Sequence, residues 1–348
     1  GHIYVHGEWV TRYFGPGGDV AIPEGFTRIC CGVFQDCEGA SDVTGITIPK
    51  SVTRIDDHVF PYCANLKEIR VEAGNPRYCV VDGLLMEKGG MVLHSCPPAR
   101  SGVLEIPEGV TEIGDSAFAC CSNLTEVVIP EGVTRIGWRA FWRCSGLADV
   151  TIPKSVTYID SDVFRDCTNL TRVVIPEDVA HIGWSAFEGC TNLEEIRAEA
   201  GNQRFCAIDG MLLERDGSTL YLHTCPAAKS GILAIPEGVS QIAECAFYGC
   251  TGLTEVVIPG SVREIGDSAF YGSSGLTEVI IPEGVIRIGD SAFKGCTNLT
   301  HVELPQSVCE IGNGAFRGTG MSEEAVRAAY DRAKESDLEL DVEAVGRR

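Results

Sequence analysis

Apolar residues recur along this chain in a short pattern, Leu-x-x-Val-x-Ile-Pro, as in Leu124, Val127, Ile129 and Pro130. The last two apolar positions alternate with polar ones, which is the period of a β-strand that buries one face. The proline ends the strand because it has no N–H to donate to a neighbouring strand. The pattern therefore predicts a short strand that ends at Ile129.

The same stretch continues with a turn and then a second apolar pair, Val133 and Ile136. An Ala-Phe pair that ends at Phe141 comes next, and a small residue, usually cysteine, precedes the next leucine. Each such coil offers only about seven inward apolar positions, which cannot close a core alone. We therefore expect coils to stack at the spacing of paired strands, about 4.8 Å, as the turns of a parallel superhelix.

The copies are regularly spaced along the chain. Six of the seven regular steps between Ile-Pro or Leu-Pro prolines are 23 residues, and the first step is 26. A fixed period of this size is typical of a solenoid or another repeat array. The prolines are Pro23, Pro49, Pro107, Pro130, Pro153, Pro176, Pro236, Pro259, Pro282 and Pro305.

The full pattern, Cys-x-x-Leu-x-x-Ile/Val-x-Ile-Pro-x-x-Val-x-x-Ile-x-x-x-Ala-Phe, resembles the BspA-like class of bacterial leucine-rich repeats over roughly residues 20–318. The resemblance implies an α/β-type repeat solenoid that is mostly β, a right-handed superhelix of short parallel strands. We expect residues 1–348 to form one such domain. Its expected parts are an N-terminal cap (1–20), the repeats (21–318) and a C-terminal helical cap and tail (319–348).

Two long steps interrupt the period, and they match one another. Residues 73–105 and 200–234 both carry Ala-Gly-Asn, then Asp-Gly, an apolar run, a Gly-containing turn and a second apolar run. This order of residues is typical of a β-hairpin. We therefore predict two modified coils, at 73–105 and 200–234, that each contain a hairpin.

The chain end has a different pattern from the repeats. Ser322 precedes two acidic residues and an alanine-rich run with basic residues later, as expected for a capped helix at about 322–335. We expect this helix to cover the open face of the last coil.

The charge of the chain narrows the classes of partner. A net charge of −21 argues against nucleic acid and against anionic membranes, since both require basic patches. No apolar run approaches the roughly 20 residues that cross a bilayer, so we expect no membrane insertion. Because the first residue is Gly1 and not methionine, we expect that an export signal was removed.

Seventeen cysteines are present, and most of them follow the repeat. We interpret the column as buried free thiols that act as small apolar fillers, because Ser273 occupies the same position in one coil. Disulfides between neighbouring coils remain an alternative. Each modified coil also carries Cys-His-Cys, for which packing, a local disulfide and a zinc site are all open; the residues are Cys79, His94, Cys96 and Cys206, His223, Cys225.

Positions between the buried residues of the strand point outward and form columns across coils. One column contains Glu126, Asp149, Arg172 and Glu195, and it continues through Glu255, Glu278 and His301. The next contains Val128, Val174 and Arg197, and it continues through Val257, Ile280 and Glu303. The columns can be a partner surface or merely good strand formers.

Tryptophans replace polar residues beside the Ala-Phe pair in some coils, at Trp138, Trp142 and Trp184. Such replacements are candidate binding hot spots or contacts with a neighbouring coil. Our predicted partner-binding residues are Glu126, Val128, Asp149, Arg172, Val174, Glu195, Arg197, Trp138 and Trp184.

No phosphate-binding loop, nucleophile elbow, His-Glu-x-x-His or calcium loop is present, so we predict no catalytic, cofactor or metal residue. The resemblance implies a secreted or cell-surface bacterial scaffold that binds a protein, such as a host matrix protein or another cell-surface protein, and mediates adhesion. An intracellular protein-binding scaffold is the alternative, favoured by unpaired thiols. An enzyme is the third hypothesis and would need a pocket between the hairpins and the coil array.

Overall fold

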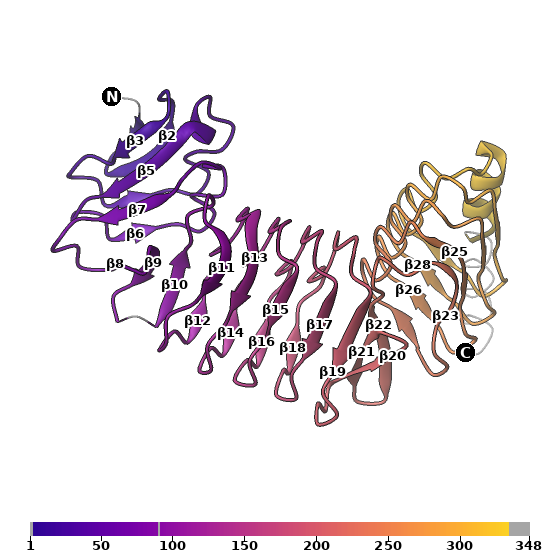
Figure 1. Cartoon of the computed structure of the whole chain (residues 1–348). Helices are drawn as coiled ribbons and strands as arrows, with labels where there is room; N and C mark the ends of the chain where they lie inside the picture. Colours follow the sequence, from indigo (N-terminus) through magenta and orange to yellow (C-terminus); the bar gives the residue numbers. More distant parts are fainter. Residues whose placement is uncertain (1–2, 90, 334–348) are drawn as a thin grey trace, which may run out of the picture. The chain divides into compact units, whose positions relative to one another are not determined.

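Two units, Gly1–Phe187 and Glu188–Arg348, make up the chain, and the computed structural model describes residues 3–89 and 91–333. Each unit is a mostly-β solenoid in which corresponding strands of successive coils pair in parallel (Figure 1). The predicted repeat solenoid is confirmed. That residues 1–348 form one domain stays a prediction.

Each regular coil contributes two strands, and only the first was predicted from the sequence. The Val-x-Ile segment forms the longer strand, and the second apolar pair forms a strand of two residues. We call the sheets of the longer strands the long-strand face and those of the two-residue strands the short-strand face. Strands of two residues are too short to show alternation, so the sequence pattern did not reveal the second sheet.

Among the described residues of the first unit, the long-strand face contains seven strands. Two three-stranded parallel sheets have the orders β3-β5-β7 and β11-β13-β15, and β17 follows in the next coil. The strands are β3 (Gly18–Ala21), β5 (Val43–Ile48), β7 (Glu68–Val71), β11 (Ser101–Glu105), β13 (Asn123–Val128), β15 (Asp149–Thr151) and β17 (Arg172–Ile175); a 3-10 turn, η1 (Ala40–Asp42), precedes β5.

The short-strand face of the first unit has two sheets, with orders β1-β2-β4-β6 and β18-β16-β14-β12-β10-β9-β8. The first begins with the antiparallel pair β1 and β2, which lies in the expected N-terminal cap and pairs onto the first coil through β4. The strands are β1 (Ile3–His6), β2 (Trp9–Tyr13), β4 (Arg28–Ile29), β6 (Arg54–Ile55), β12 (Glu112–Ile113), β14 (Arg135–Ile136), β16 (Tyr158–Ile159) and β18 (His181–Ile182).

The modified coil at 73–105 contains the predicted hairpin and one strand more. The hairpin joins β9 (Leu84–Glu87) to β10 (Val92–Ser95), and β8 (Tyr78–Val81) pairs antiparallel with β9. The turn between β8 and β9 is Asp82-Gly83, with φ of 49° and 80°, as two-residue hairpin turns require. The modified coil therefore inserts a three-stranded meander into the short-strand face.

The second unit repeats this plan. Its meander is β20 (Phe205–Ile208), β21 (Met211–Asp216) and β22 (Thr219–Thr224), so the hairpin predicted within 200–234 is confirmed. Its long strands are β19 (Glu195–Ala198), β23 (Gly231–Ala234), β25 (Leu253–Val257), β27 (Glu278–Ile280) and β29 (His301–Glu303). Its short strands are β24 (Gln241–Ile242), β26 (Glu264–Ile265), β28 (Arg287–Ile288) and β30 (Glu310–Ile311).

The phenylalanines at the end of each Ala-Phe pair, or of the Val-Phe pair that replaces it at Phe164, form a buried row in each unit. The ring centres of Phe118 and Phe141 are 4.9 Å apart with planes 1° from parallel, and Phe164 and Phe187 continue the stack. In the second unit Phe247, Phe270, Phe293 and Phe316 stack in the same way. These rows, with the inward Val, Ile and Leu side chains, are the core of each unit.

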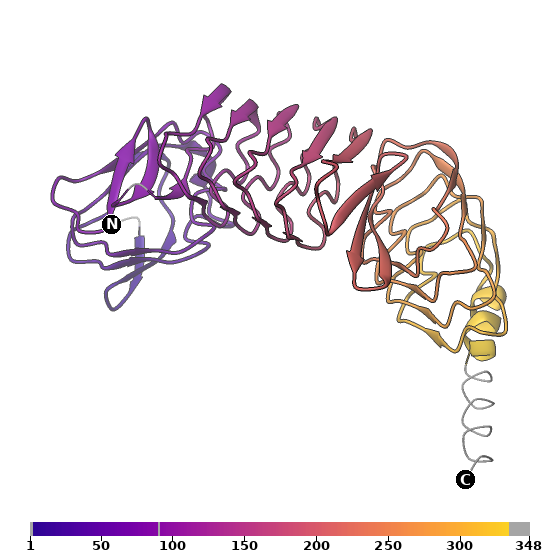
Figure 2. The same ribbon diagram turned by 90° about the horizontal axis from the view of Figure 1, so that it is seen from below.

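A helix at 323–333 closes the last coil, as predicted (Figure 2). Ser322 caps it, since its Oγ accepts the N–H of Ala325 at 3.2 Å. The Tyr330 hydroxyl donates to the Gly312 carbonyl at 2.9 Å and accepts the Ala315 N–H at 3.0 Å. The expected helix end at 335 and the tail to 348 lie outside the described residues.

Candidate functional site

The predicted outward columns are present on the long-strand face of the first unit. Glu126 is aligned with Asp149, and Val128 is aligned with Thr151, in the parallel register of β13 and β15. All four residues are exposed, and Val127 between them is buried. Period-two alternation in the sequence thus identified which residues face solvent.

Arg172 and Val174 lie on β17, where both are exposed on either side of buried Val173. Glu195 and Arg197 belong to β19 of the second unit, where the carboxylate accepts a hydrogen bond from Arg197 Nε at 2.8 Å. This pair lines a hollow of about 690 Å³ together with Lys229.

The second unit carries the columns further. Glu255, Glu278 and His301 are in register on β25, β27 and β29, and so are Val257, Ile280 and Glu303. Ile280 is 55% exposed, which is unusual for an isoleucine in a packed repeat. Each unit therefore presents a row of charged side chains beside a row that contains β-branched side chains.

The tryptophans lie at the corner beside the Phe row, away from the long strands. Trp142 is 9% exposed and packs against His58, with ring centres 5.1 Å apart. Trp138 is half-buried, and the Arg139 guanidinium lies 4.3 Å from its ring centre. Trp184 is 42% exposed. Trp142 is thus mainly a packing residue, whereas Trp138 and Trp184 remain predicted site residues.

The cysteine column has the geometry of free thiols. None of the 17 cysteines, all of which lie in the described part of the chain, forms a disulfide, and the column members Cys121, Cys144, Cys167 and Cys296 are buried. The Cys144 thiol donates to the Phe118 carbonyl at 3.0 Å, and Ser273 Oγ donates to the Phe247 carbonyl at 2.7 Å. Serine and cysteine therefore make the same hydrogen bond at this position.

The Cys-His-Cys sets are not gathered as metal ligands in the described part of the chain. Across residues 3–89 and 91–333, no three His, Cys, Asp or Glu side chains come together as ligands. His94 instead bonds through Nε2 to the Ile55 carbonyl at 3.1 Å, and burial lowers its pKa. His223 Nδ1 lies 2.8 Å from Thr224 Oγ1.

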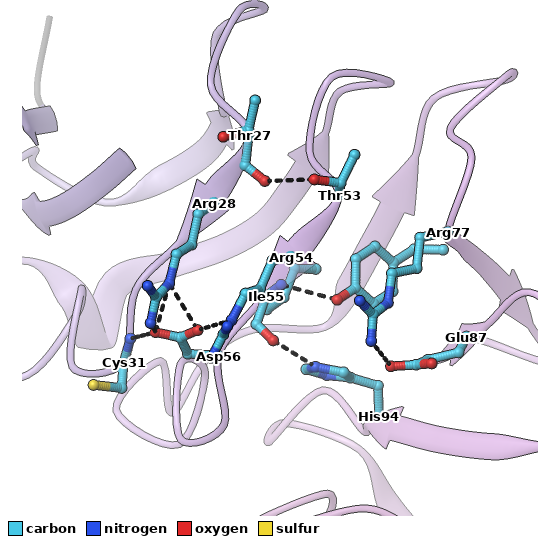
Figure 3. A network of polar contacts seen from close by, with 11 residues as sticks. Thr27, Arg28, Cys31, Thr53, Arg54, Ile55, Asp56, Arg77, Glu87 and His94 are labelled. Atoms are coloured by element: carbon cyan, nitrogen blue, oxygen red, sulfur yellow. Dashed lines mark hydrogen bonds and ion pairs between the residues drawn. The ribbon is translucent and has the colours of Figure 1, made fainter. Parts of the chain in front are cut away.

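A polar network on the short-strand face was not predicted (Figure 3). Asp56 accepts two hydrogen bonds from Arg28 Nε and Nη2, one from Arg54 Nε and one from the Cys31 N–H. Burial alone would raise the pKa of Asp56, but these hydrogen bonds outweigh it and lower the pKa. One carboxylate thereby joins two successive coils.

The same network ends where the modified coil begins. The Tyr78 hydroxyl accepts the Ile55 N–H at 2.9 Å, and His94 bonds to the Ile55 carbonyl, so two side chains replace the backbone ladder beside β6. Arg77 pairs with Glu87 at 3.0 Å across the meander (Figure 3). The sequence shows this face only through isoleucines that recur every 23 residues, as at Ile113, Ile136 and Ile159.

Two cavities of the first unit meet at this break. One, of about 320 Å³, is lined by Asp57, His94, Asp115 and Arg135 among others. The second, of about 460 Å³, we call the corner cavity; it is lined by Arg28, Gln35, Arg54, Asp57, His58 and Trp138 together with Asp56, Cys31 and Gly32. Asp57 lines both cavities. Of the predicted site residues, the corner cavity contains Trp138.

None of the helical segments in the described part of the chain has the length and apolar character of a membrane-spanning helix.

Comparisons with known proteins agree with this architecture. The family described as BspA type leucine rich repeat region matches residues 18–77, 99–207 and 224–331, in six copies. The gaps between these ranges fall within the two modified coils. No curated protein matches the chain.

Two solved structures are similar to the whole repeat array. A leucine rich cell surface protein from Faecalibacterium prausnitzii is 27% identical, with a TM-score of 0.60 over 94% of this chain and 97% of that chain. The pneumococcal vaccine antigen PcpA is 21% identical, with a TM-score of 0.58 over 91% of this chain and 76% of that one. The second likeness shows the fold.

Proposed function

The chain belongs to the BspA-type leucine-rich repeat family, and on this premise we propose that it is a non-enzymatic, protein-binding scaffold of a bacterial cell surface. Its expected partner is a host matrix protein or another cell-surface protein, held by contacts spread along the long-strand face. The specificity would come from the outward columns, because the inward positions are needed for the core.

The aligned columns are the observation that carries this proposal. Glu126 and Asp149 on the first unit, and Glu255 and Glu278 on the second, stand beside exposed Val128, Val257 and Ile280. A surface that combines exposed apolar side chains with charges fits the composition of protein interfaces. Acidic rows would also speed encounter with a basic partner surface.

The location at the cell surface rests on the likeness to the F. prausnitzii protein, which is described as a leucine rich cell surface protein. This likeness extends over nearly the whole of both chains, so it compares the full repeat array of this chain with the full array of that protein. Adhesion is the role that we propose for such a surface.

An intracellular scaffold is the alternative. The lack of disulfides among the described cysteines favours it, since disulfides are rare in a reducing compartment. Cell fractionation with an antibody to this chain distinguishes the two. Recovery from the surface of intact cells supports the first function, and recovery only from the cytosol supports the second.

Charge reversal on one column tests the binding surface. Immobilised matrix and bacterial surface proteins are screened with the wild-type chain, and positive partners are then tested with the double variant Glu126→Lys, Asp149→Lys. We expect the affinity for a partner of this face to fall by about tenfold or more, because like charges would then face the partner's basic groups.

The matched control reverses two exposed acids in the turns, Glu108→Lys and Glu131→Lys, and thus changes the net charge equally. Equal loss in both variants would indicate a non-specific charge effect. Failure of the wild-type chain to bind any protein of the panel would count against the proposed function.

A further inference from the structure

The corner cavity lies beside an aspartate that lacks the hydrogen bond which other aspartates at its coil position make to the next coil. In three regular coils the residue three positions before the phenylalanine is an aspartate that accepts the N–H of the residue 23 positions later. Asp115 does so with Trp138 at 2.9 Å, Asp267 with Asp290 at 2.9 Å, and Asp290 with Asn313 at 2.6 Å. Asp57 occupies the same coil position, but the next coil is the modified one, which has no Ala-Phe corner.

The Asp57 carboxylate consequently has no backbone N–H of the next coil to accept. Among the described residues, no ion pair and no hydrogen bond joins its side chain to another residue. Its carboxylate is exposed where both cavities open. The surrounding chain excludes part of the solvent, and Asp115 adds negative charge; both effects raise its pKa.

An indole forms another wall of the corner cavity and is held in place. The backbone N–H of Trp138 donates a hydrogen bond to Asp115, and the Arg139 guanidinium lies over the indole ring. Arg139 itself pairs with Asp162 at 3.3 Å, so the ring and its cation are both anchored to neighbouring coils. His58 lies 6.2 Å from the indole, ring centre to ring centre, and its Nδ1 is bound by Ser116 Oγ at 2.7 Å.

The charges that line the corner cavity balance. Two guanidinium groups, of Arg28 and Arg54, face two carboxylates, of Asp56 and Asp57. Asp56 is already bound by both arginines, so the cavity offers no net charge to an ion. It does offer hydrogen-bond donors and acceptors, from Asp57, Gln35 and His58, around an aromatic ring.

We propose that the corner cavity binds a neutral saccharide. A sugar ring has an apolar C–H face that packs on an indole, and its hydroxyl groups both donate and accept hydrogen bonds. Adjacent hydroxyls can donate to the two oxygens of Asp57 and accept from Gln35 or Arg54. The volume of about 460 Å³ lies within the roughly 300–1,000 Å³ usual for small-ligand sites.

The duplicated block supplies an internal comparison. Trp184 occupies in the second copy the position that Asp57 occupies in the first, so that position carries no carboxylate there. The saccharide site therefore depends on a residue that the duplication did not keep in both copies. It lies at the corner next to the short-strand face, so this site and the proposed protein-binding face can fail independently.

Methyl glycosides of glucose, galactose, mannose and N-acetylglucosamine are the probes, and binding is measured by calorimetry and by saturation-transfer NMR. We expect saturable binding of at least one glycoside to the wild-type chain. Asp57→Asn and Trp138→Ala should each weaken it by about tenfold or more. Trp138→Phe, which keeps a ring, should weaken it less.

Two controls keep the test decisive. Trp184→Ala removes an exposed indole that does not line the corner cavity, and Asp290→Asn removes a carboxylate at the coil position of Asp57 that keeps its hydrogen bond to the next coil. Both should bind the glycoside as the wild-type chain does, and thermal melting checks that every variant is folded.

Three results would overturn the assignment. The first is that no glycoside binds. The second is that folded Asp57→Asn binds the glycoside as well as the wild-type chain does. The third is that lysine amide or inorganic phosphate binds the cavity and the glycosides do not, which would show that the cavity takes an ion.

Discussion

At the residue scale, a small side chain, usually cysteine, recurs beside the Phe row. Its size is limited by the Phe rings on one side and by a carbonyl of the preceding coil on the other. The cysteine thiol packs beneath the Phe row and bonds to a carbonyl of the preceding coil, as Cys144 does with Phe118. Burial raises the pKa of Cys144 far above its usual value and that of Cys296 to about 12. These thiols are therefore protonated, and their role is packing and not reactivity.

Replacing Cys144 tests this role. We expect Cys144→Ser to cost about 1 kcal/mol or less in free energy of unfolding, because Ser273 already makes the same hydrogen bond elsewhere. Cys144→Val adds volume and loses the donor, and should cost about 1–3 kcal/mol. Urea denaturation measures both; a larger loss for serine than for valine would contradict the packing interpretation.

His58 gives the first unit a dependence on pH. Burial, and secondarily the charge of Arg139, lowers its pKa in the folded state. The unfolded chain therefore takes up a proton at higher pH than the folded one, and stability should fall as pH drops below about 6.5. Above that pH both states are neutral and the effect disappears.

Urea denaturation at neutral and mildly acid pH, with His58→Asn as the variant, checks this. The variant should lose part of the wild-type decrease, whereas His301→Gln, on the exposed long-strand face, should keep it. An unchanged decrease in His58→Asn would show that another group is responsible.

At the element scale, the long strands and the meanders follow from local patterns, and the short strands do not. Val-x-Ile-Pro contains the alternation and the stop signal of a strand, and Asp82-Gly83 contains the backbone freedom of a tight turn. By contrast, Arg135–Ile136 is a strand only because Glu112–Ile113 and Tyr158–Ile159 lie on either side. Such pairing between coils leaves no local signal.

Asn75 attaches the modified coil to the coil before it. It is 1% exposed; its Nδ2 donates to the carbonyls of Pro49 and Val52 at 2.8 and 2.9 Å, and its Oδ1 accepts the N–H groups of Arg77 and Tyr78. Asn75→Asp keeps the shape but removes both donors, which leaves buried carbonyls facing a carboxylate.

We expect Asn75→Asp to lower the free energy of unfolding by about 2–4 kcal/mol, measured by urea denaturation. Gln203→Glu is the control, because it makes the same chemical change at an exposed amide near the start of the second modified coil. It should cost much less. Equal effects would mean that the four hydrogen bonds of Asn75 contribute little.

The same contrast applies to the candidate sites. The outward columns were predictable, because a period of two assigns each side chain to one face. The corner cavity was not predictable. It lies where the coil after Asp57 departs from the repeat and offers no N–H to the Asp57 carboxylate. Trp138 was noticed as an exception to the pattern, but its neighbours His58 and Arg28 come from earlier coils and gave no signal.

At the scale of the whole molecule, stability should be a sum over neighbouring coils, since each coil contacts mainly the next. Phe141→Ala removes a ring from the middle of the stacked row of the first unit and should cost about 3–5 kcal/mol there.

Hydrogen exchange followed by mass spectrometry shows where the loss occurs. Faster exchange is expected in β12, β14 and β16, with protection of β26, β28 and β30 in the second unit unchanged. Uniform loss of protection across residues 3–333 would contradict the repeat description and indicate one cooperative core.

The central claim is that a protein partner binds the long-strand face, and site-specific photo-crosslinking tests it most directly. A photoreactive amino acid is placed at Val128 or Ile280 on that face, and at Tyr158 on the short-strand face of the first unit. The account predicts cross-links to a bound partner from Val128 or Ile280 and not from Tyr158. Cross-links from Tyr158 alone would contradict it.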